Sequence, residues 1–271
     1  MKTIALMAVA LLCCVVSRAQ IEVRGTVVSQ AGTPVAYASV QVDSQYTVTD
    51  REGRFEMAVP AGHTADMTIS HISYHDVTLP FATYRQGHVE ARMQEKVVEL
   101  PDMTILRSRG KENTISRKGL KMPGDVAFVG ASGKYDYEVG PLVSVDKDFL
   151  LQAFHFKTEE CTFATCTMRI IVYEEQKKGT FVPVHHHPVY VEAAADKTYN
   201  VRPADDILLK KGHRYFVGLS VVAHSGQGGL HLPAYLRKGV ARHFSNGRVT
   251  YLPATLGISL SGKEFMQTPN K

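Results

Sequence analysis

The sequence contains no tryptophan, only four cysteines and no long block of basic residues. Lysine and arginine number 31 against 26 acidic residues, and the formal net charge of +5 is spread along the chain. A scattered excess this small argues against nucleic acid as the main partner. The apolar fraction of 44% is enough for buried cores, and 271 residues make one large domain or two domains of about 100–200 residues each.

The one long apolar run lies at the N-terminus. Ile4–Val16 follows Lys2 and precedes the small residues Ser17 and Ala19, which is typical of a secretory signal peptide cleaved before Gln20. The run is shorter than the roughly 20 residues of a membrane-spanning helix, and an uncleaved anchor is the alternative. We therefore expect residues 1–19 to direct export, with no transmembrane span after cleavage. The expected location is the periplasm, the outer-membrane surface or the outside of a bacterial cell.

Two of the four cysteines, Cys13 and Cys14, lie in this leader, so Cys161 and Cys166 form the pair that remains. In an oxidising compartment we expect them to form a disulfide, with two free thiols as the alternative. The pair alone does not make a zinc site, because such a site takes further ligands.

Apolar and polar residues alternate after Gln20. The alternation is clear in Ile21–Val27, Ala38–Val42 and Phe55–Val59, and a period of two predicts strands with one buried face. Turn-forming residues separate these strands without an intervening helical pattern. The sequence therefore predicts an all-β protein that begins with a small β-sandwich.

Several short motifs follow one another in this region at regular spacing. They resemble the carboxypeptidase regulatory-like domain, a small transthyretin-like sandwich, over about residues 21–100. The motifs are Gly25-Thr26-Val27-Val28, Gly32-Thr33-Pro34-Val35, Ala38-Ser39-Val40, Thr49-Asp50-x-x-Gly53-Arg54-Phe55 and Ile69-Ser70-His71-Ile72-Ser73-Tyr74. Ser73 departs from the glycine that the family commonly has at this place. We assign residues 20–102 to this domain.

A polar, basic stretch follows, and residues 103–123 are predicted to be a linker; an arm that binds nucleic acid or an anionic surface is the alternative. Residues 124–263 form a second unit with strands expected at 137–145, 149–157, 167–174, 189–193, 215–223 and 256–260. Its short core motifs resemble a jelly-roll-type β-sandwich of bacterial envelope proteins. Residues 264–271 are the expected tail.

Familiar catalytic motifs are missing. No histidine begins a His-x-x-Glu or His-Glu-x-x-His metal motif, and no Gly-x-Ser-x-Gly elbow occurs. Gly257–Lys263 resembles a phosphate-binding loop, but Glu264 stands where a magnesium-binding Ser or Thr is needed. We therefore expect no catalytic residue, no metal ligand and no cofactor, and we predict a terminal strand at Gly257–Lys263.

Two segments of the second unit are the candidate binding residues. In a strand, His185 and His187 would share a face and could reach a cation, although a plain surface segment is the favoured interpretation. His224 and Gln227 lie in a glycine-rich stretch that could close over a ligand or merely turn the chain. All four are expected on exposed loops and outside the core.

The prediction is an exported, non-enzymatic envelope protein that binds or scaffolds, with a glycan or another envelope protein as partner. The alternative is a hydrolase or metal-dependent enzyme with an unrecognised site in the second unit. A pocket where acidic and histidine side chains converge would favour the enzyme. A groove lined by tyrosines and amides without such a cluster would favour a lectin-like module, since sugar faces stack on rings. A flat apolar patch would favour a protein partner. The tyrosines available for this purpose are Tyr135, Tyr137, Tyr173, Tyr190 and Tyr235.

Overall fold

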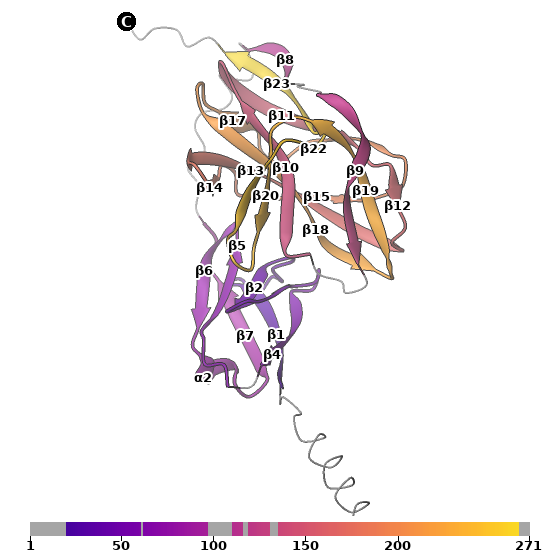
Figure 1. The fold of residues 1–271 in the computed structure, drawn as a ribbon. Helices are drawn as coiled ribbons and strands as arrows, with labels where there is room; N and C mark the ends of the chain where they lie inside the picture. The colour runs from indigo at the N-terminus through magenta and orange to yellow at the C-terminus, as the bar shows by residue number, and fades with distance from the viewer. Residues whose placement is uncertain (1–19, 61, 97–109, 116–118, 131–134, 266–271) are drawn as a thin grey trace, which may run out of the picture.

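The computed structural model describes residues 20–60, 62–96, 110–115, 119–130 and 135–265, and it contains two β-sandwich units (Figure 1). The prediction of an all-β fold is confirmed, because one four-residue helix is the only helix in the described ranges. No helix in those ranges is long and apolar enough to cross a membrane. The predicted signal peptide falls on residues 1–19, outside the described residues.

The first unit, drawn in indigo and purple in Figure 1, has two sheets. Their strand orders are β4-β1-β7 and β3-β2-β5-β6, with β1 antiparallel to β4 and parallel to β7. Its elements are β1 (Gln20–Ser29), β2 (Ser39–Val42), β3 (Gln45–Val48), β4 (Arg54–Pro60), β5 (Met67–His71), β6 (Tyr74–Leu79), α2 (Phe81–Tyr84) and β7 (His88–Met93).

Alternation builds the core of this unit as predicted. Val23 and Val27 of β1 are fully buried, while Arg24 between them points to solvent. Gly53, before β4, has φ +75°, and a Cβ on it would lie 2.5 Å from the carbonyl oxygen of Val27. A larger residue there would therefore strain the turn and push the two strands apart.

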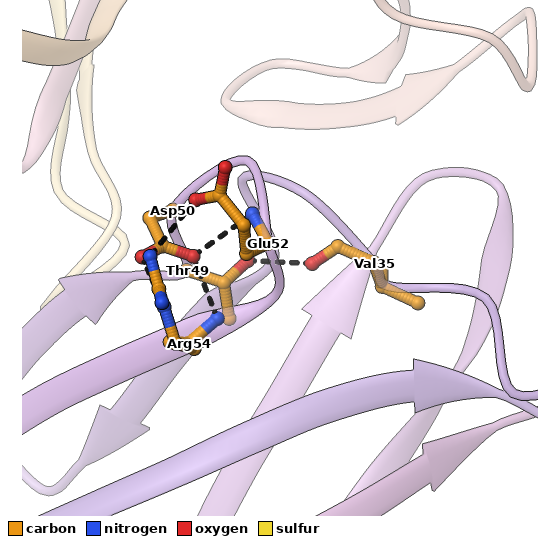
Figure 2. Close-up of polar contacts among 5 residues, drawn as sticks. All are labelled: Val35, Thr49, Asp50, Glu52 and Arg54. Carbon is orange, nitrogen blue, oxygen red and sulfur yellow. Dashed lines mark hydrogen bonds and ion pairs between the residues drawn. The ribbon is translucent and has the colours of Figure 1, made fainter.

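Side chains fix the turn between β3 and β4 (Figure 2). Oδ1 of Asp50 accepts the backbone N–H groups of Glu52 and Arg54 at 3.0 and 2.8 Å, and Oδ2 accepts Nε of Arg54 at 2.9 Å. The hydroxyl of Thr49 donates to the carbonyl oxygen of Val35 at 2.7 Å. These bonds satisfy backbone groups that no strand pairs, so the Thr-Asp-x-x-Gly-Arg motif fixes the turn by which the chain passes from one sheet of the sandwich to the other.

The second unit has a seven-stranded sheet, a five-stranded sheet and a four-stranded sheet. The seven-stranded sheet has the order β14-β13-β18-β10-β20-β21 with β15 also on β13, and the five-stranded sheet has the order β16-β11-β23-β8 with β17 also on β11. In the four-stranded sheet, β19 pairs with β12, β22 and β9. The strands are β8 (Lys111–Ile115), β9 (Leu120–Gly130), β10 (Tyr137–Ser144), β11 (Asp148–Lys157), β12 (Glu160–Cys161), β13 (Thr165–Lys177), β14 (Thr180–Pro183), β15 (Val189–Glu192), β16 (Thr198–Val201), β17 (Ile207–Leu209), β18 (Arg214–Ser225), β19 (Gly228–Leu236), β20 (Gly239–His243), β21 (Val249–Leu252), β22 (Thr255–Leu256) and β23 (Ser259–Phe265).

These strands confirm a β-sandwich, since one large core lies between the inner faces of the sheets. Phe154 and Phe156 of β11 point into that core, as do Val217 and Leu219 of β18. The jelly-roll assignment stays a prediction. The stretch that resembles a phosphate-binding loop continues into β23, as expected.

The structure shortens the predicted linker. Lys111–Ile115 forms β8 against β23, and Leu120 begins β9 against β19. Four of the five β8 residues are exposed, so this edge strand buries no face and its sequence shows no alternation. Residues 103–109 and 116–118 of the predicted linker lie outside the described residues. β23 likewise extends two residues into the predicted tail.

The two units pack against each other. Ile72, in the β5–β6 turn, contacts an apolar cluster on the outer face of the seven-stranded sheet. Nε2 of Gln41 donates to the carbonyl oxygen of Ser245 at 2.6 Å, and the rings of Tyr37 and Tyr190 lie 4.8 Å apart. The first unit therefore covers an outer sheet face that would otherwise be exposed to water.

Candidate functional site: an interdomain cleft and a polar groove

A cleft of about 700 Å³ lies where the two units meet. The first unit contributes the Pro34–Ala36 loop and the β5–β6 turn, and the second contributes the loop before β15 and strand β17. Histidine and acidic side chains converge here, which is the arrangement expected to favour an enzyme. The residues that matter most are His71, His185, His186, His187, Asp205 and Asp206.

His185 lies beside the cleft but is buried, contrary to the prediction of an exposed loop residue. It is 6% exposed. Its Nε2 accepts the backbone N–H of Val172 at 2.9 Å, and its Nδ1 donates to the carbonyl oxygen of His187 at 2.8 Å. Because both ring nitrogens are occupied, His185 fixes the loop and has no lone pair free for a cation.

His187 differs from His185 in that its ring is exposed, although both residues line the cleft. Its ring is 62% exposed, and its Nδ1 lies 2.6 Å from Oδ2 of Asp205. The segment between β14 and β15 is a loop, and the two-residue period that would align both rings applies only to strands. Within the described ranges, no group of three or more His, Cys, Asp or Glu side chains is arranged to hold a metal ion.

His71 forms the opposite wall of the cleft. The backbone N–H of Ser73 donates to its Nδ1 at 3.2 Å, so Nε2 carries the proton and faces the hydroxyl of Tyr190 at 3.4 Å. Burial, reinforced by the nearby charge of Arg169, lowers the pKa of His71 to about 4. The hydroxyl of Ser73 donates to the carbonyl oxygen of His186, which joins the two walls.

Acid is expected to weaken the fold through the two buried histidines. Burial lowers the pKa of His185 to about 4 as well, against an ordinary value near 6.5. Folded protein therefore binds these protons less tightly than the unfolded chain, so the stability present above about pH 6.5 is lost as the pH falls toward 4. Each histidine contributes a slope of about 1.4 kcal/mol per pH unit in that window. Urea unfolding at pH 7 and pH 5 measures the loss, and equal stabilities would contradict it.

His224 and Gln227 lie at the far end of β18, and only Gln227 is exposed. The ring of His224 packs 4.3 Å from Phe163 and 5.5 Å from Tyr135, and both of its nitrogens are buried without a hydrogen-bond partner. His224 is thus a strand residue paired with Cys166. The structure does not bring His224 and Gln227 together with His185 and His187.

Cys161 and Cys166 are both free thiols in the structure. Burial raises the pKa of Cys166 to about 12, with Cys161 close enough to add to the effect. A thiol held in this protonated form reacts slowly with oxidants. The disulfide stays a prediction, to be tested by non-reducing peptide mapping of the exported protein.

A second hollow, the polar groove, crosses the outer face of the five-stranded sheet. Its volume is about 870 Å³, and it is lined by residues of β8, β11, β16 and β23 and by residues 202–204 and Asp206. Alternation explains its polarity, because His155 faces outward between Phe154 and Phe156, and Asn200 faces outward beside Tyr199.

A change of partner along β11 shapes the groove. β17 pairs with Phe149–Leu151 and β16 pairs with Phe154–Lys157. Between these stretches, the register with β23 shifts between Leu151 and Ala153, so Gln152 occupies a β-bulge. Bulges re-aim side chains, and Gln152 lines the groove with Nε2 3.4 Å from Oδ2 of Asp206.

The polar groove continues into a smaller hollow of about 490 Å³ that shares Thr114 and His155 with it and ends at Tyr235. The Tyr235 ring lies over Gly257, where a Cβ would stand 2.4 Å from the ring. Gly257 therefore leaves the space that the ring occupies. Of the five tyrosines considered as platforms, Tyr235 lines this smaller hollow and Tyr190 lines the interdomain cleft.

Sequence reasoning did not select Gln152, His155 and Asn200. The signal was present as polar residues at outward positions between buried aromatic ones. It is weak because a solvated sheet face shows the same pattern, and only the bulge and the change of partner turn that face into a groove.

The first unit also matches a known family. The family model of the carboxypeptidase regulatory-like domain matches residues 22–94. This stretch is a carboxypeptidase regulatory-like domain. The regulatory-like domain favours a binding or scaffolding module, and its β5–β6 turn forms one wall of the cleft.

Other comparisons are distant. No curated protein matches the chain. Among solved structures, the chain is similar to one described as the structure of infectious bursal disease virus Gx strain, with 10% identity and a TM-score of 0.23. The match covers 83% of this chain and 59% of the viral one, so the chain spans less than two thirds of that protein's length.

Proposed function

We propose that this chain is an exported, non-enzymatic module that binds a glycan in the polar groove. The observation that carries the proposal is the run of amide, imidazole and hydroxyl groups across one sheet face with the Tyr235 ring at its end. Sugar hydroxyls both donate and accept hydrogen bonds, and amides do the same. The apolar face of a sugar ring stacks on an aromatic ring.

Charge in the groove favours a neutral glycan. The negative charges of Glu112 and Asp206 are balanced in part by the positive charge of Arg202. Nε2 of His155 lies 2.6 Å from the hydroxyl of Ser261. A groove without an excess of basic residues gives an anionic polymer little attraction. Its lining has few apolar side chains, which argues against a hydrophobic peptide. Export is supported by the layout of residues 1–19 and would place the groove among cell-surface glycans.

A screen of neutral oligosaccharides on an array, followed by calorimetry with the best binder, tests this proposal. Asn200→Ala and Tyr235→Ala are each expected to weaken binding about tenfold, equivalent to about 1.4 kcal/mol. The matched control is Gln176→Ala, which removes an exposed amide elsewhere on the second unit. The proposal would be contradicted if no neutral glycan bound, or if the Asn200 and Tyr235 variants bound the glycan with the affinity of the wild type.

The second candidate is a hydrolase that uses the cleft. Asp205 could orient His187 as a general base, since Nδ1 faces the carboxylate and leaves Nε2 free. Against it, both nitrogens of His185 and both of His71 make hydrogen bonds within the protein, and the hydroxyl of Ser73 donates to a carbonyl. Hydrolysis of peptide, ester or glycoside substrates that disappears in His187→Ala would establish this candidate.

A further inference from the structure

The interdomain cleft has no role in the glycan proposal, yet its shape is set by many contacts. The β5–β6 turn is tied to the opposite wall through Ser73 and His186, and Arg51 forms an ion pair with Glu192 beside it. Walls held in this way form a cavity before any ligand arrives, which lowers the entropy cost of binding.

One wall of the cleft is an edge strand. β17 pairs with β11, and in the described part of the chain no strand pairs with its other side. Alternate residues along this wall, Asp206, Leu208 and Lys210, line the cleft, while Ile207 and Leu209 point into the core. An open edge offers backbone donors and acceptors to an extended chain, and side-chain pockets then add selectivity.

The remaining lining combines apolar and acidic side chains. Val35, Val184 and Leu208 supply the apolar part. Four carboxylates, Glu95, Glu174, Asp205 and Asp206, line the cleft together with two lysines, Lys96 and Lys210. The two buried histidines of the cleft walls, His71 and His185, stay neutral near pH 7. The carboxylates outnumber the lysines, although Asp205 already contacts Nδ1 of His187 at 2.6 Å, and the cleft therefore complements a ligand with an apolar side chain and a basic one.

We propose that the interdomain cleft binds an extended peptide segment of another protein, with an apolar side chain over Val35 and Leu208 and a lysine or arginine beside Glu95 and Asp205. This site adjoins the polar groove and shares Asp206 with it, but Val35, Glu95 and Asp205 lie outside the groove, so the proposal stands whether or not a glycan binds there. The partner it fits is an exposed strand or tail of a protein exported to the same compartment.

Selection from a displayed library of random short peptides tests the proposal. The chain is expected to enrich peptides that contain an apolar residue near a basic one. Replacing that basic residue by glutamine, or replacing Glu95 and Asp205 of the chain by Gln and Asn, is expected to weaken binding about tenfold each. The control is Glu90→Gln, which removes an exposed carboxylate on β7 outside the cleft and should leave the affinity unchanged.

The proposal would be overturned by no enriched peptide, by enriched peptides without basic residues, or by equal affinity for the double variant and the wild type. Binding lost in Asn200→Ala would also overturn it, because that residue lines only the polar groove. Retained binding in Asn200→Ala together with loss in the double variant supports it. Mass spectrometry of the bound peptide shows whether it is cleaved. Cleavage would support the cleft as the peptide site and overturn the non-enzymatic interpretation of the chain.

Discussion

Replacing Glu138 by alanine is expected to lower the free energy of unfolding by about 3–5 kcal/mol. Glu138 is 1% exposed on the outer face of the seven-stranded sheet. Its Oε1 accepts Nε of Arg242 at 2.6 Å, and its Oε2 accepts the hydroxyl of Tyr173 at 3.1 Å. Without this carboxylate, the largely buried guanidinium of Arg242 loses the partner that offsets its desolvation.

Arg169 makes the same loss more costly. It lies on the same sheet face, 5% exposed, and its Nη1 reaches the carbonyl oxygen of Tyr37 in the regulatory-like domain at 3.5 Å. Its guanidinium is also 5.3 Å from the centre of the Phe244 ring. Removing Glu138 therefore leaves two cations near the interface between the units without a buried counter-charge.

Chemical unfolding of the purified chain measures the effect, and Glu138→Gln separates charge from shape because it keeps the size of the side chain while it removes the charge and one of the two accepting oxygens. The matched control is Glu22→Ala, since Glu22 pairs with Arg24 at 3.2 Å on the surface with both side chains mostly exposed. A surface pair of this kind contributes about 1 kcal/mol or less. A loss for Glu138→Ala as small as for the control would show that water reaches this face and that the units are not closed on each other.

His185→Ala is expected to lower the free energy of unfolding by about 2–4 kcal/mol. The change leaves the backbone N–H of Val172, in the centre of β13, without its acceptor. It also opens a cavity beside the large core and releases the carbonyl oxygen of His187. His187→Ala is the matched control, since that ring is mostly exposed and its loss is expected to change stability by no more than about 0.5 kcal/mol.

Thermal or urea unfolding of the two single variants measures the stability that each one loses. A partial rescue by His185→Gln, whose amide can both accept and donate, would assign the loss to the two hydrogen bonds. Equal melting temperatures for His185→Ala and the wild type would return His185 to the surface role that its sequence context predicts.

The histidine run shows why sequence reasoning reached the cleft but not its geometry. Alternation and turn residues predict strands well, because a strand with one buried face has apolar residues at every second position, as in Ile21–Val27. Loops have no such alternation. The burial of His185 in a loop depends instead on its contact with Val172, thirteen positions earlier. Local periodicity does not contain such contacts.

The interface between the units could not be predicted from local periodicity for the same reason. Arg169 stands between Met168 and Ile170 in a strand buried on both faces, and alternation there is obscured because the regulatory-like domain covers the second face. Its contact at Tyr37 lies 132 positions away. A buried arginine within an apolar strand is the one local sign that a second layer covers it.

Residues 202–206 form a thin partition between the two proposed ligand sites. Asp205 faces the cleft, Arg202 faces the polar groove, and Asp206 lines both. A glycan that displaces this segment would also change the cleft, and the peptide would in turn change the groove. Thermodynamic linkage makes the two effects equal: whatever factor a bound glycan applies to peptide affinity, the bound peptide applies to glycan affinity. If both proposed ligands bind, this shared segment makes the occupancy of one site depend on the occupancy of the other.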